Sequence, residues 1–243
     1  MDLGLDGRVA LVTAGSKGLG LASARALAGD GARVLLASRS TESLEAARRS
    51  VVAAGGGECE VAEADLNDPE APARLVEEAV GRWGRLDVVV ANNGGPPPGP
   101  ALAVDDAAIE AAVNANLLAS VRLVRAAARH MAAGGWGRIC CITSYSVVLP
   151  IPSLSLSNVA RTALYAWVRT ACRELLPRGI TINLACPGAH ATERMKQLGG
   201  GGGGPMGDPE DFGKAVAFLC SQAAGFITGT TLVVDGGATA AQP

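Results

Sequence analysis

Short apolar runs rich in β-branched residues alternate along the chain with longer stretches rich in alanine and arginine. The apolar runs lack the polar alternation of half-exposed strands, and such runs are typical of parallel strands that are covered on both faces. The pattern predicts seven strands, at Arg8–Thr13, Arg33–Ala37, Glu58–Ala64, Asp87–Ala91, Arg138–Thr143, Thr181–Ala185 and Thr231–Val234.

Helix-length segments lie between these strands, and one of them has a clear start where Asp208 precedes Pro209. The predicted helices are Gly18–Gly29, Thr41–Ala54, Pro69–Trp83, Val104–Met131, Ser153–Leu176 and Asp208–Ser221. Strict alternation of strand and helix predicts an α/β fold, a single-domain Rossmann-type doubly wound parallel sheet of about seven strands. The stretches Gly94–Pro100 and Gly199–Gly204 are too short to separate domains, so we expect one domain over residues 1–243.

Composition excludes several classes of protein. The 243 residues carry 21 basic and 23 acidic side chains, so binding to nucleic acid through the phosphate backbone is not expected. No apolar run reaches the roughly 18 residues of a membrane span, and we expect a cytoplasmic protein without a membrane partner. Six cysteines form no C-x-x-C pair and only two histidines are present, so no metal site is predicted.

A glycine-rich turn follows the first predicted strand, in the segment from Thr13 to Gly20. Its glycines allow a tight turn and a close approach of the backbone to a diphosphate. The helix that starts near Gly18 offers unpaired N–H groups and the positive end of its dipole. Because the turn lies between a first strand and a helix, it predicts a dinucleotide site that includes Gly15, Ser16, Lys17, Gly18, Leu19 and Gly20.

The spacing of this turn resembles that of the short-chain dehydrogenase/reductase family, and the resemblance extends almost from end to end. Further segments resemble the family in order and spacing: Asp65-Leu66, Asn92-Asn93-Gly94-Gly95, Asn116-Leu117, Ser144, Pro187-Gly188 with Thr192, and Asp235-Gly236-Gly237. The resemblance implies that Asp65 contacts adenine, that Asn116 and Ser144 belong to the active site, and that Pro187, Gly188 and Thr192 surround the nicotinamide. It also implies that Leu66, Asn92 and Gly94 lie at the cofactor.

The second strand indicates which nicotinamide is used. It ends in Ser38-Arg39 and lacks the carboxylate that commonly binds an adenine ribose 2′-hydroxyl. Arg39 offers a permanently charged planar fork suited to a 2′-phosphate, and Lys17 adds a second cation. NADP(H) is therefore the predicted cofactor.

The chain departs from the family at its catalytic centre. Family members place a Tyr thirteen residues after the catalytic Ser and a Lys four residues further on. Counting from Ser144 reaches Ser157 and then Arg161. A serine hydroxyl is a far weaker acid than a phenol, and an arginine with a pKa above ~12 does not lend a proton, although its fork suits ribose hydroxyls. The candidate site is therefore Asn116, Ser144, Ser157 and Arg161.

Other residues are candidates for the missing acid. Tyr145 follows Ser144 at the ligand-binding edge of the sheet and is either a proton donor or a pocket wall. Tyr165 lies two turns beyond Ser157 and fits better as helix packing. His190 lies on the loop that faces the nicotinamide, where it either titrates near neutral pH or is a surface side chain.

These features predict an NADPH-dependent reductase that transfers hydride to a C=N group, as in an iminium ion, or to a C=O group of a bulky substrate typical of secondary metabolism. The six glycines from Gly199 predict a mobile or open cover over that substrate. The alternatives are a conventional 3-oxoacyl or ketone reductase with Tyr145, His190 or water as the acid, and a redox-silent NADP-binding regulator or scaffold. The family resemblance also implies a homodimer or homotetramer that pairs through Val104–Met131 and Ser153–Leu176.

Overall fold

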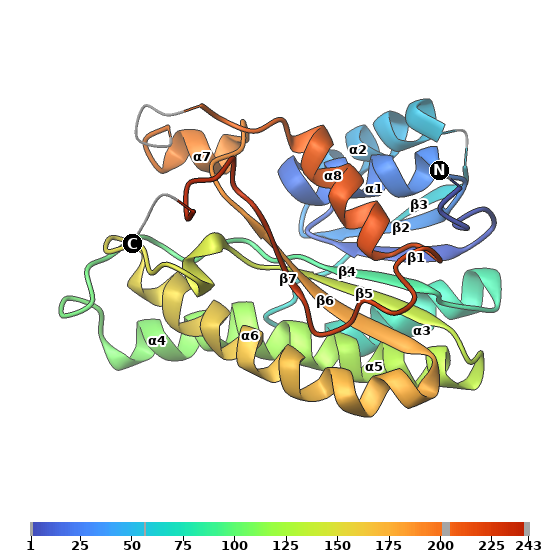
Figure 1. Ribbon diagram of the computed structural model, residues 1–243. Coiled ribbons are helices and arrows are strands. Elements are labelled where there is room, and N and C mark those ends of the chain that lie inside the picture. Colours follow the sequence, from blue (N-terminus) through green and yellow to red (C-terminus); the bar gives the residue numbers. More distant parts are fainter. Residues whose placement is uncertain (1, 56, 201–204, 241–243) are drawn as a thin grey trace.

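The structure is a computed structural model that describes residues 2–55, 57–200 and 205–240. Its centre is a seven-stranded sheet in which every neighbouring pair is parallel, in the order β3-β2-β1-β4-β5-β6-β7 (Figure 1). The strands are β1 (Val9–Thr13), β2 (Arg33–Ser38), β3 (Cys59–Glu63), β4 (Val88–Ala91), β5 (Gly137–Ile142), β6 (Ile180–Pro187) and β7 (Thr231–Val234). The strand order reverses between β1 and β4, which is where sheets of this kind bind ligands.

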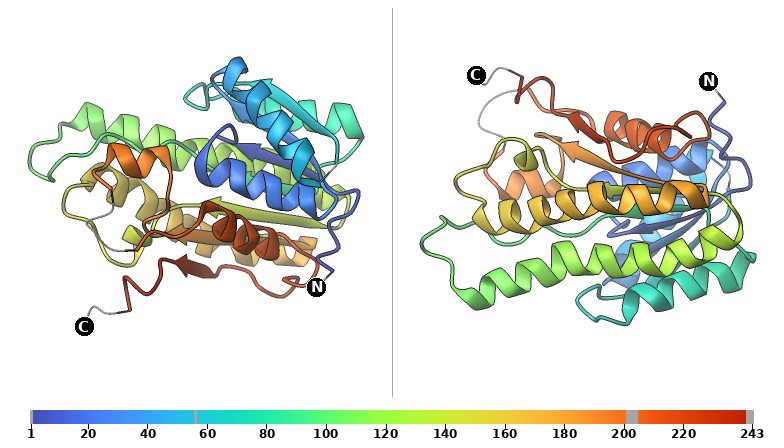
Figure 2. Two further views of the ribbon diagram at one scale, coloured as in Figure 1. Left: turned by 90° about the horizontal axis from the view of Figure 1, so that it is seen from above. Right: turned by 60° about the horizontal axis from the view of Figure 1, so that its bottom comes forward.

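Helices cover both faces of the sheet (Figure 2). One layer contains α1 (Gly18–Gly29), α2 (Thr41–Gly55) and α8 (Pro209–Leu219), and the other contains α3 (Ala71–Trp83), α5 (Ala119–Ala133) and α6 (Ser155–Leu175). Successive strand residues point to opposite faces, so that Val9 and Leu11 join one core cluster while Ala10 and Val12 join the other. This double burial explains why the strands are apolar throughout, and it confirms the predicted fold class.

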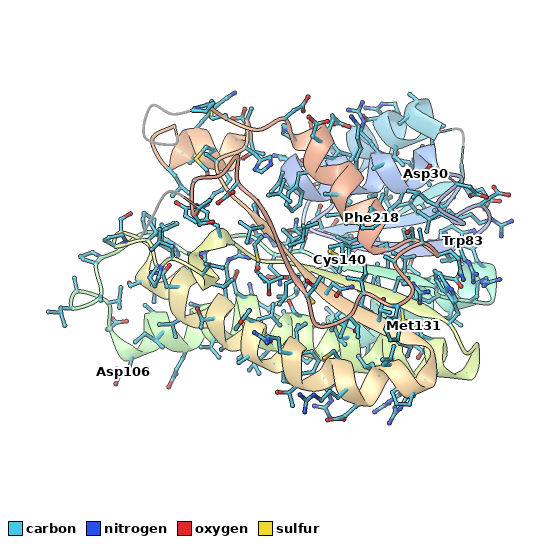
Figure 3. The ribbon with its side chains drawn as sticks, in the orientation of Figure 1. Asp30, Trp83, Asp106, Met131, Cys140 and Phe218 are labelled. Atoms are coloured by element: carbon cyan, nitrogen blue, oxygen red, sulfur yellow. The ribbon has the colours of Figure 1, made fainter. Side chains whose placement is uncertain are left out.

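The core lies between the sheet and each helix layer. Met131 of α5 and Cys140 of β5 lie inside these layers, whereas Asp106 is exposed at the outer start of α4 (Asp106–Val113) (Figure 3). The helix formed by residues 106–133 is long and apolar enough by length and composition alone to cross a membrane. Its Leu123, Val124 and Met131 nevertheless pack in the core, so the fold already accounts for its apolar face.

All seven predicted strands and all six predicted helices are present, with ends that differ by one or two residues in most cases. The predicted helix Val104–Met131 starts later, at Asp106, and contains a π-helical turn, η1 (Asn114–Leu118), before α5 begins. The sequence pattern did not reveal the short helix α7 (Glu193–Gln197), because five residues are too few for a periodicity. Of the predicted glycine-rich cover, residues 201–204 lie outside the described part of the chain.

Candidate active site

The turn from β1 to α1 is fixed by close packing of backbone atoms. Thr13 Oγ1 donates to the carbonyl of Asn92 at 2.8 Å and accepts from its backbone N–H at 2.9 Å, which joins the ends of β1 and β4. A Cβ atom at Gly20 would lie 2.5 Å from the carbonyl oxygen of Ala14 and 2.8 Å from Asn92 Nδ2. Ala14 itself has a φ of 44°, and α1 begins at Gly18 without a side-chain cap. The first N–H groups of α1 are therefore free to bind an anion.

A cavity of about 880 Å³ opens beside this turn, at the carboxyl edge of the sheet. It brings together eight of the predicted site residues: Ser16, Lys17, Ser38, Arg39, Asp65, Leu66, Gly94 and Asn116. The Oγ of Ser38 is buried and, within the described chain, lacks a hydrogen-bond partner. Lys17 and Arg39 are exposed cations on the same wall. This wall has the donors and the positive charge that a 2′-phosphate requires.

The other predicted cofactor residues shape the turn and do not line the cavity. Gly15 donates its N–H to the carbonyl of Ala37, and Leu19 packs against the core cluster of the α1 layer. Asn92 Nδ2 donates to the carbonyl of Ala14 at 3.3 Å. At the far side, a Cβ at Gly188 would lie 2.7 Å from the Cα of Asp235, so Pro187-Gly188 can run beside β7 only with a glycine there.

Ser157 and Arg161 form a buried pair in the first turns of α6. Arg161 Nε donates to Ser157 Oγ at 3.2 Å, while its Nη1 donates to the carbonyls of Ile142 and Thr143 at 3.1 and 2.8 Å. These bonds join α6 to the carboxyl end of β5. Because Ser157 Oγ accepts from Arg161, its own proton is free to be donated to another group.

The guanidinium of Arg161 is buried and therefore poorly solvated. Burial lowers the pKa of Arg161 to about 10, the thiol of Cys186 opposes this shift, and the like charge of Arg194 adds to it. Burial also raises the pKa of Cys186 to about 11, so this thiol is neutral at pH 7 although it lies 2.9 Å from Thr143 Oγ1. Of Arg161 and Cys186, therefore, only Arg161 carries a charge at pH 7.

Two further predicted site residues lie on or next to elements that pack against α6. Ser144 caps a short 3₁₀ turn, η2 (Tyr145–Val147), and its Oγ accepts from the N–H of Ser146 at 3.1 Å. Asn116 lies in the π-helical turn, a feature that often occurs at functional sites in helices. Its Nδ2 donates to the carbonyl of Ala112 at 3.4 Å, but its buried Oδ1 has no partner among the described residues.

The structure shows where each alternative proton donor lies. His190 is buried, with Nδ1 3.2 Å from the carbonyl of Gly188 and its ring edge-on to Phe212, so the prediction of a surface histidine is wrong. Tyr165 packs beside the core and pairs with Arg169, as expected for a helix-packing residue. Tyr145 is half-buried in η2 and, like Ser144, Ser157 and Arg161, is not among the residues that line the large cavity.

The sequence analysis did not single out Arg194, which lies in α7 close to the predicted residue Thr192. Thr192 Oγ1 caps α7 by accepting from Met195 N, and the Thr192 methyl lies 3.5 Å from the place of a Cβ at Gly18. From the same helix, Arg194 Nη2 donates to the carbonyl of Pro96 at 2.6 Å. Helix α7 thus connects the glycine turn to the loop after β4. Only the proximity of Arg194 to Thr192 in sequence hinted at this position.

A parallel sheet with a glycine turn, a free helix N-terminus and a cavity at its switch point defines a dinucleotide-binding α/β protein. The chain belongs to the short-chain dehydrogenase/reductase family: the sequence model described as enoyl-(acyl carrier protein) reductase matches residues 13–239. It is an oxidoreductase of that family.

Individual relatives agree with this conclusion. The chain is 36% identical to an uncharacterized oxidoreductase of Mycobacterium tuberculosis, over 97% of this chain and 93% of that protein. It is 34% identical to the human dehydrogenase/reductase SDR family member 4, over 96% of this chain and 88% of that one. The structure of L-sorbose reductase from Gluconobacter frateurii, complexed with NADPH and L-sorbose, superposes with a TM-score of 0.90 at 28% identity and covers 97% of this chain and 98% of the other.

Proposed function

We propose that this protein is an NADPH-dependent reductase that transfers hydride to a C=N or C=O group at a site built from Asn116, Ser144, Ser157 and Arg161. The observation that carries the proposal is the hydrogen bond from Arg161 Nε to Ser157 Oγ at 3.2 Å. This bond supports the proposal because it joins a hydroxyl to a cation at positions 157 and 161, where the family resemblance implies Tyr and Lys. Hydride transfer is kept, and a phenolic acid is replaced by a weak donor.

The residues around the glycine turn fit NADP(H). The unpartnered Ser38 Oγ, with Arg39 and Lys17, is placed to hold the 2′-phosphate, and the N–H groups at the start of α1 are placed to hold the diphosphate. Asp65 and Leu66 supply the adenine wall, and Asn92 and Gly94 shape the floor of the cleft. Pro187, Gly188 and Thr192 border the nicotinamide side. The Nη2 of Arg161 is left to bind ribose hydroxyls, since Nε and Nη1 have other partners.

The acceptor we favour is a C=N bond, most simply an iminium ion. NADPH supplies a hydride, and its addition to an iminium cation gives a neutral amine directly. The residues of the site then need only to position the acceptor, and no side chain has to deliver a proton. A bulky secondary-metabolite-like amine is the substrate that we propose.

Reduction of a C=O group is the second candidate, because one observation favours it. Hydride addition to a carbonyl creates an alkoxide, which must be stabilised as it forms. The free proton of Ser157, with the Arg161 cation behind it, is suited to donate a hydrogen bond to that oxygen. A conventional ketone or 3-oxoacyl reductase would then take its proton from solvent through Ser157, or from Tyr145.

The test is a panel of stable iminium salts and cyclic imines beside ketones and aldehydes of matched size, followed by the absorbance of reduced nicotinamide. We expect C=N turnover to exceed C=O turnover and to survive Ser157→Ala within about threefold, with Ser50→Ala on α2 as the matched control. Ketones that turn over faster, and whose turnover Ser157→Ala lowers by about 10², would establish the carbonyl reductase. Tight NADPH binding without consumption would indicate the redox-silent protein.

The proposal also includes a homo-oligomeric assembly and a cytoplasmic location. A homodimer or homotetramer that pairs through Val104–Met131 and Ser153–Leu176 would add a second helix layer to the outer faces of α4, α5 and α6. Sedimentation of the purified protein tests this assembly, with a monomer as the contradicting result. A cytoplasmic location is tested by fractionation of cells that produce the chain.

A further inference from the structure

Two arginine side chains reach the ends of neighbouring strands of the sheet, β5 and β4. Arg161 extends from α6 toward the end of β5, and Arg194 extends from α7 toward the loop after β4. Burial is the main cause that lowers the pKa of Arg161, and the like charge of Arg194 adds to it. Two like charges in a partly buried place repel each other, so this arrangement costs free energy unless an anion joins them.

The position of Arg194 is defined by its neighbours. Its Nη2 donates to the carbonyl of Pro96 at 2.6 Å. A Cβ at Gly95 would lie 3.1 Å from Nη2 and 3.3 Å from Nε, so the guanidinium lies flat against a residue without a side chain. Gly95 and Pro96 also line the 880 Å³ cavity. The guanidinium therefore lies beside two residues that line the cavity without lining it itself, and its Nε and Nη1 have no hydrogen-bond partner among the described residues.

No carboxylate of the described chain neutralises this pair. Within residues 2–55, 57–200 and 205–240, neither Arg161 nor Arg194 forms an ion pair. The nearest acid in sequence, Glu193, pairs with Lys196 at 2.6 Å. The carboxylate of Asp235 accepts from Thr239 and from the N–H of Gly237. The carboxylates of Glu193 and Asp235 are thus engaged elsewhere, and those that line the cavity, Asp65 and Asp105, form no ion pair with either arginine.

The phosphates of the cofactor belong to a different part of the cleft. Thr192, at the start of α7, approaches Gly18 and the N-terminus of α1, where the diphosphate is proposed to bind. Arg194 extends from the same short helix to the opposite wall, at Gly95 and Pro96. An anion that binds Arg194 would therefore belong to the other ligand of the cleft, the substrate.

We propose that Arg194 binds a carboxylate of the substrate, so that the acceptor is a C=N or C=O compound that carries a carboxylate near the reducible bond. This inference rests on the proposed function and names its substrate class. A planar guanidinium with two free N–H directions suits bidentate binding of a carboxylate. The same anion would balance the positive charge of an iminium group, so a cyclic imino acid or a 2-oxo acid fits the site better than a simple cation.

The experiment compares acids with their neutral esters. Phenylpyruvate and pyrroline-2-carboxylate, each beside its methyl ester, are titrated calorimetrically into the NADP⁺-loaded protein, and NADPH consumption is measured with the same four compounds. The variants are Arg194→Met, which keeps the length of the side chain, and Arg194→Lys, which keeps its charge. Arg49→Met, on the exposed face of α2, is the matched control.

The expected result is a preference for acid over ester of about 10- to 100-fold, which Arg194→Met abolishes, Arg194→Lys partly restores and Arg49→Met leaves unchanged. The ratio of acid to ester separates binding from structure, because loss of the bond to Pro96 alone would weaken both ligands equally. Equal loss for both, or a wild-type protein that binds no acid better than its ester, overturns the inference. If acids bind selectively but NADPH is never consumed, the proposed function fails and this inference stands.

Discussion

The adenosine end of the cleft and its nicotinamide end are built on different kinds of constraint. At the adenosine end, the turn from β1 to α1 depends on backbone atoms that approach too closely for any side chain at Gly20. At the other end, we propose that Ser157 and Arg161 occupy the positions where the family has Tyr and Lys, on a helix α6 that is present as predicted. Backbone approach leaves few residues possible, whereas side-chain chemistry can change while the fold is kept.

The strongest test of the first constraint is Gly20→Ala. Its methyl group would lie 2.5 Å from the carbonyl of Ala14, and that oxygen is backbone that cannot rotate away. We expect NADPH affinity to fall by at least roughly 10², measured by fluorescence titration, with a lower melting temperature. Gly81→Ala on α3 is the control, because no atom lies within 4 Å of its added Cβ. That variant should gain about 0.5–1 kcal/mol of stability. Normal NADPH binding by Gly20→Ala would contradict the packing argument.

The second constraint is tested at Arg161. Arg161→Ala removes the donors to two backbone carbonyls and to Ser157, so cofactor affinity and rate should fall together, with kcat/KM lower by about 10². Arg161→Lys keeps a cation and should keep much of the activity. Arg173→Ala, exposed on the same helix, is the control. Unchanged kinetics for Arg161→Ala would show that the nicotinamide end does not depend on this charge.

The pH profile of the wild-type enzyme sharpens the same point. Because burial lowers the pKa of Arg161 to about 10, its cation should be lost as the pH rises toward that value, and kcat/KM should fall there. Stability should move the other way: the cost of burying the charge is present below about pH 10 and is relieved as the pH rises from there toward the ordinary pKa of an arginine. An ionisation between pH 6 and 8 that controls kcat would instead indicate a different acid.

The sequence predicts features that are determined locally, and it does not predict contacts that depend on tertiary packing. The strands and the glycine turn were found because each is determined locally, by an apolar run or by glycines at fixed spacing. The placement of Ser157 and Arg161 on one helix also followed from spacing. The two carbonyl acceptors of Arg161 did not, since Ile142 and Thr143 reach it only through tertiary packing. Arg194 was missed for the same reason, because its partner Pro96 lies 98 residues away.

The cofactor preference is tested by Arg39→Ala, with an expected loss of NADPH affinity of about 10- to 100-fold. The physical reason is the loss of a charge-assisted hydrogen bond to the 2′-phosphate. NADH, which lacks that phosphate, serves as the control and should bind equally well to both proteins. Equal losses for NADPH and NADH would place Arg39 away from the phosphate and would weaken the contrast between the two ends of the cleft.

Ser38→Ala should have the smallest effect on NADPH affinity of the substitutions discussed. It should also raise the melting temperature of the free protein, whereas Gly20→Ala should lower it. The buried Oγ of Ser38 has no partner within the described chain, so the hydroxyl costs stability until a ligand reaches it. We therefore expect Ser38→Ala to raise the melting temperature of the free protein slightly and to weaken NADPH binding by roughly threefold to tenfold, in line with one neutral hydrogen bond. NADH affinity should stay the same. Differential scanning fluorimetry with and without each cofactor measures both effects on the same samples.

If Ser38→Ala melts at a lower temperature without ligand, the hydroxyl already has a partner in the free protein. The 2′-phosphate site would then be held by Arg39 and Lys17 alone.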